Sequence, residues 1–161
     1  MLIDSTYKIA LFGHRDFDKH KELDSLLYPM LCDFMRSKTF VEIYIGRNGE
    51  FDIYTASLVK KAQKAFGTEI SALFCVLPYN QKDTEYYEKY YDEVIIPYCI
   101  YQSHPKGAIR KRNEWMIAQA DLIICYVERN YGGAYQALKY AKRLGKETIN
   151  LSELNAKDRP I

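Results

Sequence analysis

The chain has 161 residues, a hydrophobic fraction of 48% and a charged fraction of 27%, which are ordinary values for one globular domain. Its formal net charge of +2 is too small to argue for nucleic acid or a membrane surface, and no apolar run approaches the ~20 residues that span a bilayer. The N-terminus lacks the basic segment and apolar core of a secretory signal. We therefore expect a cytoplasmic protein with a single domain over residues 1–161 and a frayed tail from about residue 152.

Strand and helix patterns alternate along the first part of the chain. The expected elements are a strand over 7–12, a helix over 23–34, a strand over 40–45 and a helix over 52–66. Pro29 must kink or restart the first helix, because proline cannot donate a backbone hydrogen bond. Asp52 is placed as the N-cap of the second helix, and Ile53 is expected on its inner face.

The alternation continues to the C-terminus. The expected elements are strands over 70–77, 93–96, 122–127 and 148–151, and helices over 83–91, 106–120 and from Gly132-Gly133 to Leu144. Leu144 is assigned to the inner face of the last helix. The tyrosines between residues 86 and 101 are interleaved with acidic residues, which favours an amphipathic surface or a subunit contact over a base-stacking platform.

The four cysteines and three histidines show no metal-binding pattern. Cys32, Cys75, Cys99 and Cys125 have no short spacing, and we expect all four to be buried, reduced thiols. The sequence thus predicts no metal site, and it predicts no cofactor.

This order of elements predicts an α/β fold. Strands separated by helices, without hairpin signals between them, indicate a single-domain, Rossmann-like, doubly wound and mainly parallel sheet of five to six strands with helices on both faces. Ligands of such sheets bind beyond the carboxyl ends of the strands, where the strand order reverses. Three polar loops with glycines follow the first, second and fifth strands, and we expect them to converge on one cleft.

These three loops hold the candidate ligand-binding residues. They are Gly13, His14 and Arg15 in the first loop, Gly46, Asn48 and Gly49 in the second, with Asp52 after it, and Gly132 and Gly133 in the third. The second loop matches neither the dinucleotide fingerprint nor the Walker loop, and a structural turn is its alternative explanation. The glycine pair before the last helix favours phosphate contact over a simple turn. Arg15 taken alone is typical of a solvated loop charge.

The segment from Arg112 to Gly133, RNEWMIAQADLIICYVERNYGG, carries a family resemblance. It resembles the lonely-guy phosphoribohydrolases, in which an Arg-Lys pair on a helix precedes a Gln-Ala-Asp sequence before a strand and a Pro-Gly-Gly-x-Gly-Thr-x-x-Glu loop. With GHR after the first strand and G-x-N-G-x-F-D after the second, the chain resembles the broader SLOG superfamily from Lys8 to Ile149. That superfamily also includes the DNA-processing protein DprA and many small nucleotide-ligand sensors.

The resemblance implies a catalytic role for Arg112, but the chain departs from the hydrolases in its partners. Asn113 replaces the lysine, and the loop glutamate falls on Gln136 or Ala137, depending on the alignment. A carboxylate stabilises the positive charge that develops when an N-glycosidic bond breaks, and its loss typically costs about 10² to 10⁴ in rate. The substitutes bordering the predicted cleft are Glu50, which we name as the second catalytic candidate, and Asp16, Asp52 and Glu128. Glu128 is expected to form an exposed pair with the adjacent Arg129.

These residues favour binding over hydrolysis. The leading hypothesis is a module that senses, carries or sequesters a nucleotide or a nucleotide derivative. In this hypothesis Gly132, Gly133 and Arg112 hold phosphate, Asn48, Gly49 and Asp52 face the ribose, and Gly13, His14 and Arg15 border the base or a second phosphate. The alternative is a phosphoribohydrolase of nucleoside 5′-monophosphates with a relocated carboxylate.

Single-stranded nucleic acid is the third and least favoured partner, and we do not expect it. Such binding would require one continuous basic groove made of Lys60, Lys61, Lys64, Arg110 and Lys111. A homodimer is expected by resemblance, with Trp115, Met116 and Tyr135 as candidate contact residues. Core packing would explain Trp115 and Met116 equally well.

Overall fold

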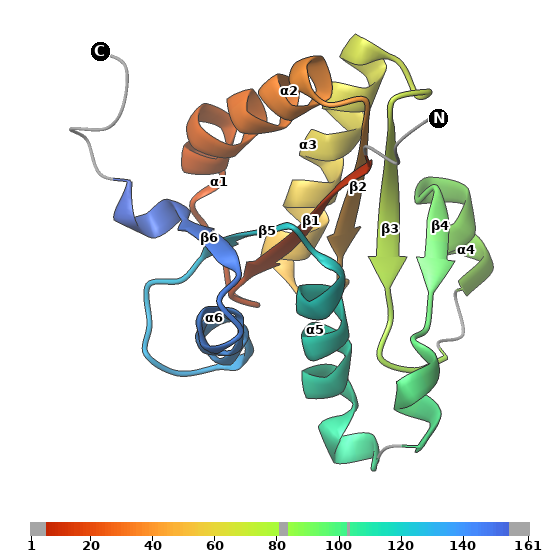
Figure 1. The fold of residues 1–161 in the computed structure, drawn as a ribbon, viewed down its shortest axis with the longest axis vertical. Coiled ribbons are helices and arrows are strands. Elements are labelled where there is room, and N and C mark those ends of the chain that lie inside the picture. The colour runs from red at the N-terminus through yellow and green to blue at the C-terminus, as the bar shows by residue number, and fades with distance from the viewer. Residues whose placement is uncertain (1–5, 81–83, 103, 155–161) are drawn as a thin grey trace.

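The computed structural model describes residues 6–80, 84–102 and 104–154, and its centre is one six-stranded sheet (Figure 1). The strands are β1 (Thr6–Gly13), β2 (Phe40–Ile45), β3 (Ser71–Val76), β4 (Glu93–Ile95), β5 (Leu122–Tyr126) and β6 (Glu147–Asn150). Their order is β4-β3-β2-β1-β5-β6, and every pairing is parallel. The predicted Rossmann-like α/β fold is confirmed.

Helices connect the strands and cover both faces of the sheet. They are α1 (His20–Glu22), a π-helical turn (Leu23–Leu27), α2 (Tyr28–Ser37), α3 (Glu50–Phe66), α4 (Thr84–Tyr90), α5 (Ala108–Gln119) and α6 (Gly133–Arg143), with 3₁₀ turns at Tyr98–Gln102, Pro105–Gly107 and Leu151–Glu153. The predicted restart at Pro29 is present, because the π-helical turn ends at Leu27 and Pro29 lies in the first turn of α2.

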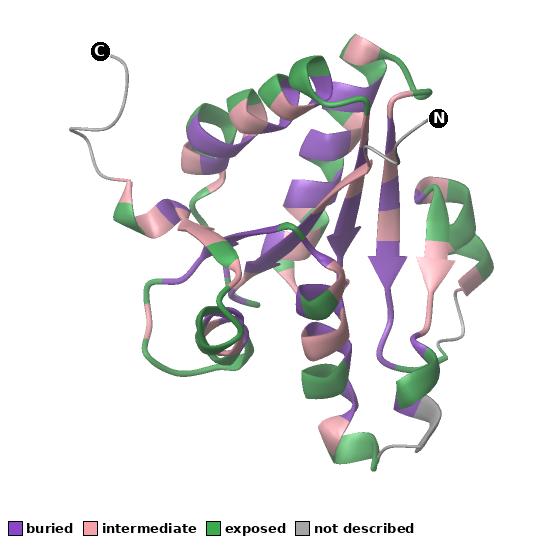
Figure 2. Ribbon diagram, in the orientation of Figure 1, coloured by how far each residue is buried: buried purple, intermediate pink, exposed green. Residues whose placement is uncertain are grey.

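Alternating side chains of β1 show how the two layers form. Ile9 and Leu11 belong to the hydrophobic cluster on the face that α2 and α3 cover, whereas Ala10 and Phe12 belong to the cluster under α5 and α6. Because successive strand residues point to opposite faces, a strand that is apolar throughout requires cover on both sides. The four inner strands, β1, β2, β3 and β5, are accordingly buried over at least half of their length, whereas the residues of the edge strands β4 and β6 are intermediate or exposed (Figure 2).

The strand order creates a crevice beside β1. The chain runs from β1 outward through β2 and β3 to β4, and then crosses to β5 and β6 on the other side of β1. The connections that leave β1 and β5 therefore diverge, and the loops after these two strands open at their carboxyl ends. Gly13 pairs in register with Tyr126, so the two strands end at the same level of the sheet.

Three side chains differ from the predicted burial. Ile53 is 45% exposed, because α3 begins at Glu50 and buries Phe51 and Thr55, which puts residue 53 on the opposite side of the helix. Leu144 is exposed because α6 ends at Arg143. Cys99 is exposed, whereas the other three cysteines are buried as predicted.

The described part of the C-terminal segment packs against the sheet. Leu151 is buried, and the Ser152 hydroxyl donates to the Val127 carbonyl at 2.7 Å. The remainder of the predicted frayed tail, residues 155–161, lies outside the described residues, as does the start of the helix predicted from Asp83.

Candidate functional site

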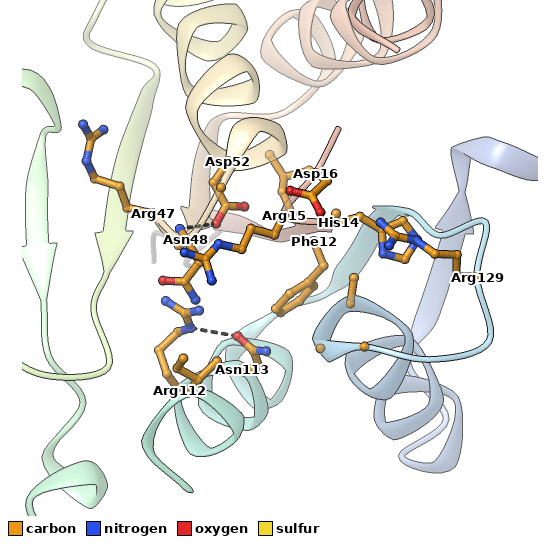
Figure 3. Close-up of a pocket in the computed structure, with 18 of the residues that line it drawn as sticks. Phe12, His14, Arg15, Asp16, Arg47, Asn48, Asp52, Arg112, Asn113 and Arg129 are labelled. Atoms are coloured by element: carbon orange, nitrogen blue, oxygen red, sulfur yellow. Dashed lines mark hydrogen bonds between the residues drawn. The ribbon is translucent and has the colours of Figure 1, made fainter. Parts of the chain in front are cut away.

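The loops after β1, β2 and β5 enclose a cleft of about 470 Å³ at the carboxyl edge of the sheet, with the start of α5 as its remaining wall (Figure 3). All ten residues predicted to bind a ligand line it: Gly13, His14, Arg15, Gly46, Asn48, Gly49, Asp52, Arg112, Gly132 and Gly133. The expected convergence of the three loops is thus present. That these residues bind a ligand stays a prediction.

Backbone and side-chain bonds connect the three loops to one another. The Glu50 amide, at the start of α3, donates to the Arg15 carbonyl at 2.9 Å and joins the loop after β2 to the loop after β1. The Glu128 amide donates to Nε2 of His14 at 3.1 Å and joins the loop after β5 to the loop after β1. The cleft walls are therefore held together by hydrogen bonds of the chain itself.

His14 takes part in this connection as a neutral side chain. The residue is 8% exposed, and burial lowers the pKa of its imidazole, with the nearby Arg129 acting in the same direction. Because Nε2 accepts a hydrogen bond, the proton of the neutral ring is assigned to Nδ1. His14 is therefore a structural link between two loops as well as a lining residue.

Arg112 is the most deeply buried charge of the cleft. It is 3% exposed; its Nε donates to Asn113 Oδ1 and its Nη1 donates to the Val76 carbonyl, both at 2.7 Å. A guanidinium has five N–H groups, so three have no partner among the described residues. Burial lowers the pKa of Arg112, yet a guanidinium stays protonated at any physiological pH.

The absence of a side chain at Gly46 leaves the space that the Arg112 guanidinium occupies. A Cβ on Gly46 would lie 2.7 Å from Nη1 of Arg112, closer than real Cβ contacts come. The guanidinium therefore lies against the backbone where β2 ends. Asn113, which stands where the hydrolases have lysine, accepts from Arg112 and so orients it.

Asp52 is not the N-cap of α3, as the sequence had suggested. The helix begins at Glu50 with Gly49 as its N-cap, and Asp52 lies within the first turn, where its Oδ2 accepts from the Asn48 amide at 3.0 Å. Burial raises the pKa of Asp52, although this bond and the charge of Arg112 oppose the shift. Its other oxygen has no hydrogen-bond partner among the described residues and is available to the cleft.

Two of the candidate carboxylates do not reach the cleft. Glu50 is exposed and does not line it, because two residues along a helix correspond to about 200° of rotation away from Asp52. Glu128 pairs with Lys19 at 3.0 Å instead of with Arg129, and it does not line the cleft either. Asp16 and Asp52 are the lining carboxylates in the described part of the chain.

Positive charge prevails in the cleft, and it lies on two sides. The lining arginines are Arg15, Arg47, Arg112 and Arg129. Arg47 points away toward β3 and β4, where it donates to the Tyr91 hydroxyl at 3.1 Å (Figure 3). Arg15 and Arg112 lie with Asn48 on one side, and Arg129 lies beside His14 on the other (Figure 3). An anionic ligand therefore meets cations at both sides.

Several lining residues were not named from the sequence as site residues. They are Leu11, Phe12, Arg47, Tyr79, Ile109, Asn113, Arg129, Tyr131 and Ala134. The position of Tyr79 and Tyr131 in loops after β3 and β5 could have identified them as lining residues. The sequence argument considered only the tyrosines between residues 86 and 101. Of those, Tyr87, Tyr90 and Tyr91 pack on or within the hydrophobic core.

The basic residues, the candidate dimer contacts and the two positions aligned with the hydrolase glutamate do not line the cleft. Lys60, Lys61, Lys64, Arg110 and Lys111 do not line the cleft, and the first two lie over the rings of Tyr90 and Tyr28. Met116 is buried, and Trp115 and Tyr135 pack partly against the same hydrophobic cluster, so core packing accounts for all three. Gln136 is exposed and Ala137 is buried, and neither lines the cleft.

No group of three histidine, cysteine, aspartate or glutamate side chains within residues 6–80, 84–102 and 104–154 is placed to hold a metal ion. Over the same residues, no helix has both the length and the apolar character that a bilayer crossing requires.

Comparison with known proteins gives structural matches alone. No protein-family model matches the chain, and neither does any curated protein. Among solved structures, DprA from Streptococcus pneumoniae is similar with a TM-score of 0.61 and 16% identity, over 88% of this chain and 49% of that protein. DprA from Helicobacter pylori is similar with a TM-score of 0.57 and 16% identity, over 90% of this chain and 65% of that protein. The chain thus spans about half to two thirds of these proteins.

These matches correct one expectation from the sequence. The Helicobacter pylori structure describes a single-stranded DNA binding mode of DprA, so this fold does carry nucleic-acid binding. Setting nucleic acid aside as a partner was therefore wrong. The chain has the Rossmann-like fold of these DprA structures, and this fold was predicted from its sequence.

Proposed function

We propose that the cleft binds nucleotides through their phosphate groups, either as free compounds or as units of a single strand. The observation that carries this proposal is Arg112, a buried guanidinium that lines the cleft with three N–H groups unpartnered among the described residues. Burial of a charge is costly unless hydrogen bonds and an opposite charge compensate it. A phosphate oxygen supplies both.

The other side of the cleft supports the same ligand class. Gly132 is the N-cap of α6 with a φ of 93°, and both it and Gly133 are exposed in the cleft lining. The free amides and the positive dipole end of a helix N-terminus suit a phosphate, and Arg129 adds a full charge there. Asp52 has an oxygen that suits a ribose hydroxyl.

Isothermal titration with 5′-mononucleotides tests the proposal. We expect saturable binding that weakens about tenfold in Arg15→Gln, since a hydrogen bond between charged groups contributes about 1.5–3 kcal/mol. Arg110→Gln is the matched control, because Arg110 is an exposed arginine of α5 that does not line the cleft. Absence of both heat and thermal shift at millimolar ligand would contradict the proposal.

Single-stranded DNA is the second source of the same phosphate chemistry, and the fold shared with DprA favours its inclusion. Fluorescence anisotropy with a labelled thymidine oligonucleotide distinguishes it from free nucleotide. Binding of the oligonucleotide that excess mononucleotide displaces assigns both to the cleft. No anisotropy change at low salt would leave free nucleotides as the ligands.

Hydrolysis of an N-glycosidic bond is the alternative, and the position of Asp52 favours testing it. Asp52 lines the cleft and can replace the family glutamate as the carboxylate beside the sugar. Chromatography of nucleotides after long incubation at high protein concentration would reveal released base. If base is released, Asp52→Asn should abolish it; if none appears, binding is the whole activity.

A further inference from the structure

Three large apolar side chains at the cleft are exposed to solvent. Tyr79 is 51% exposed, Ile109 42% and Tyr131 60%, and all three line the cleft. They account for three of the seven large apolar side chains that are exposed in the described part of the chain. Aromatic rings beside cations are the usual platform on which nucleobases stack.

Each tyrosine belongs to a different side of the cleft. Tyr79 lies in the loop that follows β3, shortly after Val76, whose carbonyl accepts from Arg112 Nη1, and it lines the cleft together with Arg112. The Arg129 guanidinium lies 5.5 Å from the ring centre of Tyr131, which directly precedes Gly132. The cleft thus contains two pairs of an arginine and a tyrosine.

The two pairs lie on opposite sides of the cleft. Arg112 lies against Gly46 at the end of β2, whereas Gly132 and Arg129 follow β5, and β1 lies between these strands. Two interstrand spacings amount to about 10 Å at the strand ends. The view of the cleft agrees, with Arg112 and Arg129 at opposite sides (Figure 3).

We infer that the cleft takes two consecutive nucleotide units, one with its phosphate at Arg112 and its base on Tyr79, the other with its phosphate at Gly132-Gly133 and its base on Tyr131. This inference rests on the proposed function and narrows its ligand class. A 5′-phosphorylated dinucleotide and a short stretch of single strand share this chemistry. A mononucleotide would fill one of the two subsites.

Titration calorimetry with thymidine 5′-monophosphate, pdTpdT and a ten-residue thymidine oligonucleotide tests the inference. We expect pdTpdT to bind at least tenfold more tightly than the mononucleotide, because it adds a second phosphate contact and a second stacked base. Equal affinity of these two compounds would overturn the inference and leave the proposed function standing. Failure of all three to bind would overturn both. An oligonucleotide that binds more tightly than pdTpdT identifies a strand as the source, and equal affinity identifies the dinucleotide.

Variants at the tyrosines separate stacking from mere apolar contact. Tyr79→Leu and Tyr131→Leu keep an apolar side chain but remove the ring, and each should weaken pdTpdT binding about tenfold. Tyr86→Leu is the control, because Tyr86 is 65% exposed on α4 and does not line the cleft. An unchanged affinity in both cleft variants would overturn the stacking assignment, and thermal melting of each variant checks that it is folded.

Discussion

At the scale of single residues, the site depends on how one guanidinium is held. Arg112 is fixed by the Val76 carbonyl, by the Asn113 side chain and by contact with the backbone of Gly46. Of these three partners, Val76 lies outside the motifs that carried the family resemblance. The sequence therefore predicted that this arginine belongs to the site, but it did not predict which backbone groups would aim it.

Gly46→Ala should reduce nucleotide binding without unfolding the protein. The added methyl group would lie 2.7 Å from Nη1 of Arg112 and displace the guanidinium from its bond to Val76. We expect at least tenfold weaker binding by calorimetry, together with an unchanged circular dichroism spectrum. Gly107→Ala is the control, since nothing lies within 4 Å of a Cβ there. Wild-type affinity in Gly46→Ala would show that Arg112 does not contact the ligand.

Asp52→Asn should raise thermal stability at neutral pH. Burial raises the pKa of Asp52 above its ordinary 3.8, so ionisation costs more in the folded state than in the unfolded chain. The penalty is absent below pH 3.8, where both states are protonated, and it grows as pH rises to and through the folded-state pKa. Melting temperatures of the variant and the wild type should converge toward pH 3.8 and separate at pH 7. A lower melting temperature of the variant at pH 7 would contradict this.

At the scale of elements, the cleft is formed by loops that follow strands and by the helices that begin after them. Loop positions could be predicted because apolar runs end abruptly at glycine-containing segments. The start of α3 could not be predicted to the residue, because Asp52 is chemically a good N-cap, yet Gly49 takes that position while Glu50 bonds to Arg15. The hydrogen bond from the Glu50 amide to the Arg15 carbonyl, a contact between distant segments, favours the helix start with Gly49 as N-cap over one with Asp52.

Gly132→Ala should destabilise the protein by about 1–2 kcal/mol, because its φ of 93° is unfavourable for a residue with a Cβ. This corresponds to a fall of roughly 2–8 °C in melting temperature for a chain of this size. Gly133→Ala is the matched control, since its φ is not positive and nothing lies within 4 Å of an added Cβ. Equal melting temperatures of the two variants would show that the backbone before α6 accommodates an alanine at position 132 without loss of stability.

At the scale of the whole molecule, the alternation of elements was sufficient to predict the parallel sheet and the edge that carries the cleft. The division of that cleft into two sides was not predictable, because it depends on β1 lying between β2 and β5. Gly132, Gly133 and Arg112 were expected to hold one phosphate together; all three line the cleft, and the inference of two subsites divides them between two phosphates. Sequence motifs identify members of a site, whereas strand order decides on which side of the cleft each of them lies.

The affinity for the thymidine oligonucleotide should depend on salt concentration, and the strength of this dependence should show how many phosphates the protein contacts. With two phosphates neutralised, the logarithm of the affinity should fall with the logarithm of salt concentration with a slope of about −1.4. The slope is measured by anisotropy titrations at salt concentrations from roughly 50 to 300 mM. Electrostatic screening changes over this range. A slope near −0.7 would indicate one contact, and a much steeper slope would indicate a longer basic track.

The burial of Arg112 has a consequence for the lifetime of the protein. Arg112 is buried and forms none of the ion pairs found among the described residues, so none of their carboxylates is in salt-bridge contact with this cation. A bound anion would supply a counter-ion and favour the folded state in proportion to its occupancy. Proteases act on transiently opened chains, so ligand-free copies should be degraded faster than loaded ones. The amount of this protein in a cell would then follow the supply of its ligand.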